Sequence, residues 1–413
     1  MTAPETMHSR LRQWRTDTAG CGHRNHLNNA GAALMPNPVV EAMHAHLELE
    51  RNIGGYEAAD VCAAQIEHSY DDIAALLGAS AHNVALVANA TAGFVQALST
   101  IDFRRGDTII TSRCDYASNQ IQYLALQRRH EVSVVHAADL PEGGVDSESV
   151  RNLLRRQRAR LVAISWVPSN SGLVQDIAAV GQVCEEFEVP YLVDACQAVG
   201  QIPIDVSCLH CDYLSFTARK FLRGPRGMGG MYASDRALER GDYPLYVDMR
   251  GARWIGDGEI QVEPGARRFE DWEFPYALVL GLGAAVRYAL EVGSETAQAR
   301  AWALAAQVRS GLKGIPGVRV LDRGRQCCAI VTAAIRGWNA PDIVRALRER
   351  GINTSASLRE VGVLDFDDKG VESAVRISPH YYNTEEEIEQ LTGAMAELAS
   401  IHRKAFATMR DRP

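Results

Sequence analysis

The sequence predicts a two-domain α/β protein whose larger domain holds a mostly parallel, seven-stranded sheet. Two observations support this fold class. Between about residues 80 and 235, short apolar runs of strand-forming residues alternate with amphipathic stretches, which is the pattern of repeated strand-helix units. The chain also has 413 residues, of which 46% are hydrophobic and 23% are charged, so it is long enough and apolar enough for two domains with buried cores.

The expected elements of the large domain follow in chain order. The strands are Val84–Ala88, Asp107–Ser112, Val132–His136, Leu161–Ser165, Tyr191–Asp194, Tyr213–Phe216 and Gly229–Ala233. The intervening helices are Ala92–Thr100, Asn119–Arg129, Asp146–Arg158 and Ile177–Phe187. Such units cross over in a right-handed sense and leave loops at the carboxyl ends of the strands, where ligands bind.

The rest of the chain predicts a smaller α+β domain. The apolar stretch Phe274–Leu290 indicates a buried helix that leads into it. Its closing helix, Glu385–Leu398, begins with a capping box completed by Glu387. We therefore expect a large domain at 26–285 and a small domain at 1–25 and 286–413.

Charge and composition exclude several classes of function. The formal net charge is -8, so no nucleic-acid partner is expected. Met1 to Asp17 lacks a signal-peptide pattern and no apolar run reaches a membrane span, so we expect a cytoplasmic protein without a membrane partner. The nine cysteines have irregular spacings, which favours reduced thiols. Cys208 and Cys211 resemble half a zinc site, but no second pair accompanies them, so no metal is expected.

Lysine is rare in this chain and occurs only at positions 220, 313, 369 and 404. Lys220 follows an apolar strand and precedes a Gly-Pro turn. A lysine amine in such a half-buried place can lose its proton, condense with an aldehyde and later move protons. Just upstream, Thr217 and Arg219 can donate to a phosphate. The other three lysines are expected to be solvated surface residues.

Two further loops carry polar residues with two possible interpretations each. Asp194 ends a buried apolar strand, where it could hold a protonated pyridine nitrogen or cap the following helix. The run Asn89–Phe94 follows a strand and opens a helix, so its free N–H groups could receive phosphate. A threonine at that place could equally serve as an N-cap.

Taken together, these motifs resemble the cysteine-desulfurase-like branch (class V) of fold-type I pyridoxal-phosphate (PLP) enzymes, from about His26 to Leu391. The resemblance implies pyridoxal 5'-phosphate as cofactor, with Lys220 as the Schiff-base lysine. It makes Asp194 the pyridinium partner and Gln197 the neighbour of the phenolic oxygen. The residues implied in phosphate binding are Thr91, Ala92, Thr217 and Arg219, the last standing where many relatives have His.

The same resemblance assigns residues near the substrate. In Ser112–Asn119, Tyr116 stands where desulfurases present a stacking His, although ordinary packing is the alternative for this side chain. In Pro168–Ile177, Asn170 would lie beside the cofactor oxygen and the substrate. Arg376, on a short apolar strand, would bind a carboxylate in bidentate fashion. Two further substrate-binding residues are expected, Asn29 and Tyr56.

The reaction is inferred from an absence. Desulfurases carry a nucleophilic Cys upstream of the carboxylate Arg, and residues 351–375 contain none. Four segments resemble ergothioneine-pathway C–S lyases and lincosamide-pathway enzymes that process cysteine S-conjugates: His26–Gly31, Gly54–Tyr56, Asp115–Asn119 and Arg268–Trp272.

We therefore expect a C–S β-lyase that releases thiol, pyruvate and ammonia. A decarboxylating oxidative deaminase that gives an aldehyde is the second expectation. An aminotransferase, an epimerase, a cysteine desulfurase and a non-catalytic PLP-fold partner protein remain as alternatives. The expected partners are a small amino-acid substrate and, by resemblance, a second copy in a homodimer. Trp272-Glu273 replaces a Gly-Thr pair that reaches the neighbouring phosphate in desulfurases.

Overall fold

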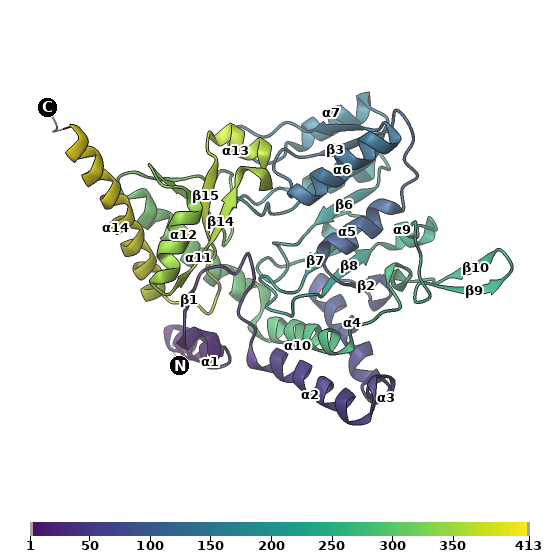
Figure 1. Cartoon of the computed structure of the whole chain (residues 1–413). Coiled ribbons are helices and arrows are strands. Elements are labelled where there is room, and N and C mark those ends of the chain that lie inside the picture. The colour runs from purple at the N-terminus through teal and green to yellow at the C-terminus, as the bar shows by residue number, and fades with distance from the viewer. Residues whose placement is uncertain (1–2, 411–413) are drawn as a thin grey trace.

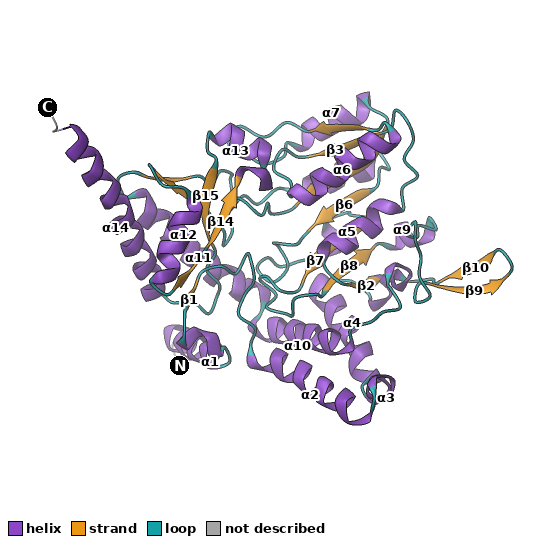
Figure 2. Ribbon diagram, in the orientation of Figure 1, coloured by secondary structure: helices purple, strands orange, loops and turns teal. Residues whose placement is uncertain are grey.

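The computed structural model describes residues 3–410, with side chains described for 7–401. Figures 1 and 2 show a large sheet with helices around it and a smaller sheet beside it, covered by the C-terminal helices. The large sheet has the strand order β2-β8-β7-β6-β5-β3-β4. Its strands are β2 (Val84–Val87), β3 (Thr108–Thr111), β4 (Ser133–His136), β5 (Ala159–Ser165), β6 (Tyr191–Asp194), β7 (Tyr213–Thr217) and β8 (Gly229–Ala233).

All seven strands expected from the sequence form, and they share one sheet. The pairs from β7 through β6, β5 and β3 to β4 are parallel, whereas β8 is antiparallel to both β7 and β2. Every residue of β2, β3, β6 and β7 is buried, as expected for strands covered on both faces. The mostly parallel sheet is therefore confirmed.

Two hydrophobic cores lie against the large sheet, one on each face. Successive residues such as Ile109 and Ile110 belong to different cores, because side chains alternate across a strand. Phe94 on one helix packs in the same core as Ile109, and Val180 on another packs with Ile110. The helices between the strands are α5 (Ala90–Ser99), α6 (Ala117–His130), α7 (Ser147–Arg156) and α8 (Ile177–Glu186).

Long helices connect this sheet to the rest of the chain. The buried helix expected near residues 274–290 is α10 (Tyr276–Val292), which packs against α2 (Asn37–Ile53) and α4 (Ala63–Leu77). The proposed domain boundary after residue 285 falls inside α10, so one continuous helix would join the two domains. Among residues 3–410 no single helix is long and apolar enough to cross a membrane, although α10 and α11 (Ser294–Lys313), bent by 79°, pass this test as a pair.

The smaller sheet is antiparallel and has the order β11-β12-β15-β14. Its strands are β11 (Val318–Val320), β12 (Val331–Ile335), β14 (Ser355–Leu358) and β15 (Ser373–Ile377). The accompanying helices are α12 (Ala340–Glu349), α13 (Val363–Lys369) and α14 (Glu385–Arg410). The predicted capping box is present, since the Thr384 N–H donates to Glu387 (3.1 Å) and the Glu387 N–H donates to the Thr384 hydroxyl (3.3 Å).

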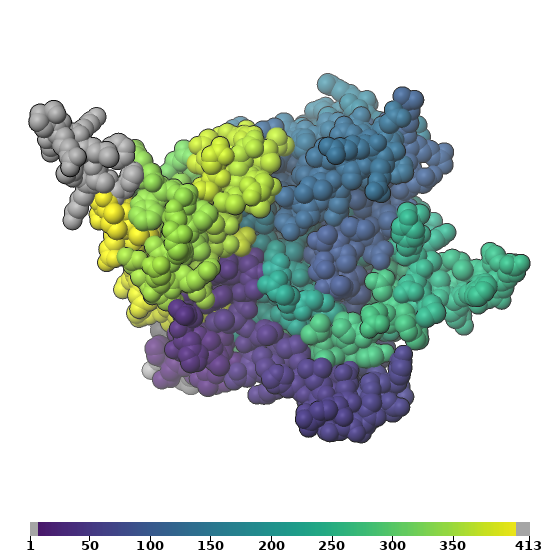
Figure 3. Space-filling view, in the orientation of Figure 1, coloured from purple at the N-terminus to yellow at the C-terminus, as the bar shows by residue number. Residues whose placement is uncertain are grey.

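Several further elements extend the basic plan. The N-terminal helix α1 (Ala3–Thr16) leads to β1 (Asn25–His26), which pairs with β13 (Ile352–Asn353). Two short helices are α3 (Gly55–Val61) and α9 (Asp235–Glu239). A hairpin of β9 (Ala252–Gly256) and β10 (Glu259–Val262) protrudes from the body of the protein, as Figure 3 shows.

Candidate active site

Lys220 lies in the tight turn that follows β7. Its side chain is only 6% exposed, and its amine lies 3.2 Å from Sγ of Cys196, to which it donates. The turn is fixed by a hydrogen bond from the Arg223 N–H to the Lys220 carbonyl (2.9 Å). Gly200 packs directly beneath it, where a Cβ would come within 2.3 Å of the Phe221 backbone. The lysine therefore sits in a rigid, buried frame.

Asp194 ends β6, next to β7 in the sheet, and therefore lies at the same edge. One carboxylate oxygen accepts from the Cys196 N–H at 2.9 Å, so the residue does stabilise the turn that follows. The other oxygen accepts from Nδ2 of Asn119 at 3.1 Å and from Oγ of Ser165 at 3.4 Å. Asp194 also lines a cavity together with Lys220, which suits the pyridinium interpretation. The helix-cap interpretation does not fit, because residues 196–201 form turns and no helix begins directly after Asp194.

A buried polar network behind Asp194 is not predicted by the sequence. Its centre is Asp115, whose two oxygens accept five hydrogen bonds. Among the donors, Asn119 and Ser165 also donate to Asp194. Burial raises the pKa of Asp115, an effect that the donors from Ser165 and Asn119 oppose. The network holds Asp194 in place through donors shared between two carboxylates.

The cavity beside Lys220 has a volume of about 280 Å³. Six of the expected site residues line it: Thr91, Tyr116, Asp194, Thr217, Arg219 and Lys220. Three other polar residues that line the cavity were not predicted from the sequence: Asn119, Cys196 and Arg226. Cys196 could have been predicted, because it follows Asp194 by two residues in a loop at the carboxyl edge of the sheet.

The expected phosphate-binding residues are only partly gathered. Thr91 at the N-terminus of α5 lines the cavity with Thr217 and Arg219. Ala92 does not line it, and its N–H donates to the Asn89 side chain at 3.0 Å, which makes Asn89 the helix cap. Arg219 is half-buried, donates to the Gly31 carbonyl, and has its pKa lowered by burial. Because the Ala92 N–H already donates to Asn89, it is less suited to donate to a phosphate.

Three other expected residues carry buried polar atoms that have no hydrogen-bond partner within the described part of the chain. These atoms are Oδ1 of Asn170, Oε1 of Gln197 and Nε of Arg376. Gln197 donates to the Ala30 carbonyl at 3.1 Å, and Arg376 donates from β15 to the Ser169 carbonyl at 2.8 Å. Burial, and secondarily the charge of Arg219, lowers the pKa of Arg376 to about 10. Arg376 is half-buried and has no carboxylate partner among the residues that the structure describes. Removing an unpaired cation from water is costly, so the surroundings of Arg376 favour an anionic ligand.

Asn29 and Tyr56 are not brought to this cavity. The Asn29 amide is fully buried and donates to the carbonyls of His26 (3.2 Å) and Ser378 (2.8 Å), while its oxygen accepts from Tyr382. Tyr56 is 70% exposed on α3 and lines a separate pocket. Their substrate-binding roles therefore remain predictions that the positions within one chain do not support.

One expectation about the lysines is wrong. Lys369 is not a solvated surface residue, since it is 7% exposed and its amine lies 2.6 Å from the Asp365 carboxylate. Lys313 is exposed as expected, and the side chain of Lys404 lies outside the described residues. Among residues 3–410, no group of three or more His, Cys, Asp or Glu could hold a metal ion.

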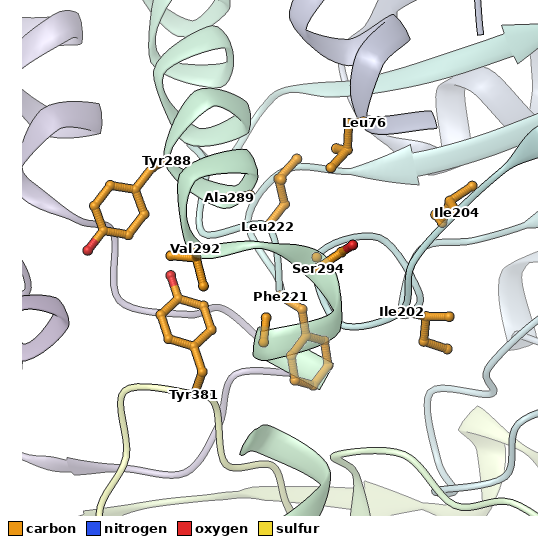
Figure 4. A pocket seen from close by; sticks show the side chains of 12 residues that line it. Leu76, Ile202, Ile204, Phe221, Leu222, Tyr288, Ala289, Val292, Ser294 and Tyr381 are labelled. Atoms are coloured by element: carbon orange, nitrogen blue, oxygen red, sulfur yellow. The ribbon is translucent and has the colours of Figure 1, made fainter. Parts of the chain in front are cut away.

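A second, nearly closed cavity lies behind the Lys220 turn. Figure 4 shows Phe221 and Leu222 facing side chains from α10 and the start of α11, with Tyr381 across from Tyr288. Its volume is only about 20 Å³, which suits a single water molecule. None of the expected site residues lines it, so the functional cavity is the one that contains Lys220.

The chemistry of the Lys220 cavity fits PLP. Asp194 offers a carboxylate to a pyridinium nitrogen and Lys220 offers an amine to an aldehyde. Arg219, Thr217 and Thr91 offer a cation and two hydroxyls to a phosphate. Asn170, Gln197 and Arg376 do not line this cavity. Oε1 of Gln197 and Nε of Arg376 are nevertheless buried without a hydrogen-bond partner among the described residues, so they remain open to ligand groups. Each of these side chains therefore has a matching group on the cofactor or on the carboxylate of an amino-acid substrate.

Comparisons with known proteins identify the family of the chain. The family model described as aminotransferase class-V matches residues 25–391. A probable cysteine desulfurase of Methanothermobacter thermautotrophicus is 26% identical over 91% of this chain and 95% of its own length. A probable hercynylcysteine sulfoxide lyase of Mycobacterium tuberculosis is 27% identical over 95% of this chain and 94% of its own.

A solved structure also shares the fold. It is a lysine-to-alanine variant of C-DES with glycine covalently linked to its PLP cofactor. Its TM-score is 0.83 at 24% identity, covering 92% of this chain and 98% of its own. At this level of identity the likeness establishes the fold, which is that of fold-type I PLP enzymes.

Proposed function

The chain belongs to the aminotransferase class-V family, and from this premise we propose that it is a C–S β-lyase that cleaves cysteine S-conjugates. Membership makes it a PLP-dependent enzyme of the group that contains cysteine desulfurases and C–S lyases. The finer assignment, to release of thiol, pyruvate and ammonia from a cysteine S-conjugate, is supported by the composition of the site and by the likeness to a probable sulfoxide lyase.

The proposal rests mainly on the residues of the segment that precedes Arg376. Residues 351–375 contain no Cys, and the side chain that this segment places against Asn170 is the carboxylate of Asp365 (2.7 Å). The thiol nearest Lys220 belongs to Cys196, whose pKa is raised by burial. Because the thiolate is the nucleophilic form, a buried thiol of raised pKa is poorly suited to accept sulfur. The site favours bond cleavage over persulfide formation.

Each residue then has a defined task. When bound, PLP supplies an aldehyde that condenses with amines and a ring that accepts electrons from the substrate α-carbon. Asp194 would keep the pyridine nitrogen protonated, with Asn119 and Ser165 holding Asp194 in position. Arg376 would bind the substrate carboxylate and thereby orient the α-carbon. The Lys220 amine would take the α-proton, and the β-carbon–sulfur bond would break with its electron pair leaving on the thiolate or, from a sulfoxide, on the sulfenate. The proton held by Lys220 can pass to a leaving thiolate, and water would hydrolyse the remaining three-carbon fragment to pyruvate and ammonia.

Tyr116 covers the ring in this scheme, at the start of α6. Its backbone N–H donates to Asp115 at 2.7 Å and to Ser165 at 3.3 Å. The stacking residue is therefore anchored to the same network that holds Asp194. A phenol ring supplies a flat apolar surface, which leaves Lys220 as the proton carrier.

We also propose that the enzyme is a cytoplasmic homodimer. All nine cysteines are free thiols, which suits a reducing compartment. Large apolar side chains are exposed on the β9–β10 hairpin and its approach, including Tyr246 (83%), Trp254 (82%) and Met249 (63%). Such a concentration is typical of a surface covered by a partner, and a second copy of the chain is the proposed occupant.

The test is incubation of the purified, PLP-loaded protein with S-alkyl-L-cysteines, their sulfoxides and hercynylcysteine sulfoxide. Mass spectrometry separates the outcomes by product. Pyruvate with thiol or sulfenate products supports the lyase. Carbon dioxide with an aldehyde would assign the decarboxylating deaminase, and alanine with sulfide, formed when free L-cysteine is supplied as a further substrate, would assign a desulfurase. Lys220→Ala protein, treated identically, controls for cleavage by free PLP.

A further inference from the structure

Asn170 is held in one orientation by a residue from the smaller sheet's half of the protein. Its Nδ2 donates to Oδ2 of Asp365 at 2.7 Å, across 195 positions of sequence. An ionised carboxylate only accepts hydrogen bonds, so this contact determines which end of the amide faces Asp365. The opposite end, Oδ1, is buried and has no partner within the described residues. The Asn170 acceptor is thus left free for a ligand.

Asp365 is itself fixed in place. Lys369, one helical turn along α13, contacts the same carboxylate at 2.6 Å. Both side chains are 7% exposed, and the Cys114 thiol lies 3.6 Å from the other oxygen. A buried carboxylate remains charged when a cation and further donors satisfy it. The pair therefore presents a charged acceptor to Asn170.

The backbone of this segment is shaped to bring α13 against Asn170. Gly362 is the N-cap of α13, and a Cβ there would come within 2.6 Å of Nδ2 of Asn170. The approach is thus closer than any residue with a side chain allows. Shortly after α13, the chain enters β15, which carries Arg376. The same segment therefore presents both the Asp365 contact and the carboxylate-binding arginine.

We propose that Asp365 is a positioning residue that acts through Asn170. It directs the Asn170 oxygen toward the bound cofactor and substrate, where it accepts from a ligand N–H or O–H. Lys369 serves this role by keeping Asp365 charged. The place of Asn170 beside the ligand is the one that the family resemblance implies, and in this respect the inference rests on the proposed function.

A double-mutant cycle tests this inference. Asp365→Leu combined with Lys369→Met removes the acceptor together with its charge partner, so no unpaired charge is left buried. Asp365→Asn combined with Lys369→Met restores an acceptor and is the rescue variant. Asp368→Leu is the matched control, because Asp368 lies on the same helix and pairs with Arg113 at the surface. Each variant is made with Asn170 intact and with Asn170→Ala.

Two quantities are measured: kcat/KM on the best S-conjugate and the dissociation constant of PLP from the protein. With Asn170 intact, the Asp365→Leu, Lys369→Met variant (the Leu-Met variant) should have kcat/KM lowered, or PLP binding weakened, about tenfold. In the Asn170→Ala background the same two substitutions should change these quantities less than about twofold. The Asn-Met variant should recover most of the loss. Equal effects in both backgrounds, or effects no larger than those of Asp368→Leu, would overturn the role of Asp365.

The PLP measurement separates this inference from the proposed function. If the wild-type protein binds PLP but cleaves no S-conjugate, the lyase assignment fails. The PLP dissociation constants of the variants still test whether Asp365 acts through Asn170. Thermal melting of each variant identifies loss of fold. In that event the Asn-Met variant, which keeps size and polarity at position 365, carries the comparison with Asn170→Ala.

Discussion

Replacing Arg376 by methionine should abolish most activity without destabilising the ligand-free protein. The Arg376 residue is half-buried, and within the described part of the chain its Nε has no hydrogen-bond partner while another guanidinium nitrogen donates to the Ser169 carbonyl. An arginine held only for structure would be expected to pair with a carboxylate. The two effects of the substitution should therefore have opposite signs.

The effect on stability follows from the lowered pKa of Arg376. Burial lowers this pKa from its usual range to about 10, which corresponds to a cost of up to about 3 kcal/mol in the free energy of unfolding at neutral pH. For a cation whose pKa is lower in the folded state, that cost is fully present below pH 10 and fades as pH rises above it. Methionine removes the charge and keeps the aliphatic stem. Losing the Ser169 hydrogen bond costs about 1 kcal/mol, so the ligand-free variant should be up to about 2 kcal/mol more stable.

The effect on activity should be a large loss. Removing one partner of a bidentate contact between arginine and a carboxylate costs about 3–5 kcal/mol, so kcat/KM should fall about 10²- to 10⁴-fold. Pyruvate release measures the first quantity, and urea denaturation of ligand-free protein measures the second. A variant with unchanged kcat/KM, or one destabilised by several kcal/mol, would refute the assignment of Arg376 to the substrate carboxylate.

Three further predictions concern the cofactor face and the core. Asp194→Asn should lower kcat by roughly 10²-fold while PLP remains attached to Lys220, because charge stabilisation is lost and binding is kept; an unchanged kcat would contradict it. Tyr116→Phe should stay within about threefold of wild type and Tyr116→Ala should lose up to about tenfold, since stacking needs only the ring; equal losses in steady-state assays would argue against stacking. Burial lowers the pKa of His380 to about 3. Between pH 6.5 and 3 the His380 imidazole therefore binds a proton in the unfolded chain but not in the folded one. Stability should therefore fall by about 2 kcal/mol between pH 7 and 5 from this group, and denaturation of His380→Gln should show a shallower decline if the account is correct.

The parts of the fold that local sequence determines were predictable. The strands of the large sheet are continuous apolar runs, and Lys220 and Asp194 were placed at the ends of two of them. Because β6 and β7 are parallel neighbours, their carboxyl ends meet at one edge, as the strand-helix pattern implies. The capping box at Glu387 is likewise a local signal, complete within four residues.

The parts that depend on distant contacts were not predictable in the same way. The spacing of Asp365 and Lys369 allows an ion pair on one helix face, but their burial depends on the docking of α13 against Asn170. Asp115 looks like an ordinary loop residue, and its five donors come from β3, β5 and α6. For Tyr56, a glycine-rich segment suggested a loop near the substrate, whereas the chain forms α3 there. Residue type and spacing carry no signal of such packing.

The attachment site of PLP is the most direct test of the account. Reduction of the PLP-loaded protein with borohydride, followed by proteolysis and mass spectrometry, identifies the modified lysine. The chain has four lysines, at 220, 313, 369 and 404, so the assignment is unambiguous. We expect the pyridoxyl group on Lys220 alone, and no pyridoxyl-modified lysine in the Lys220→Ala protein. Modification of Lys369 or another lysine, or no covalent modification of the wild-type protein, would contradict it.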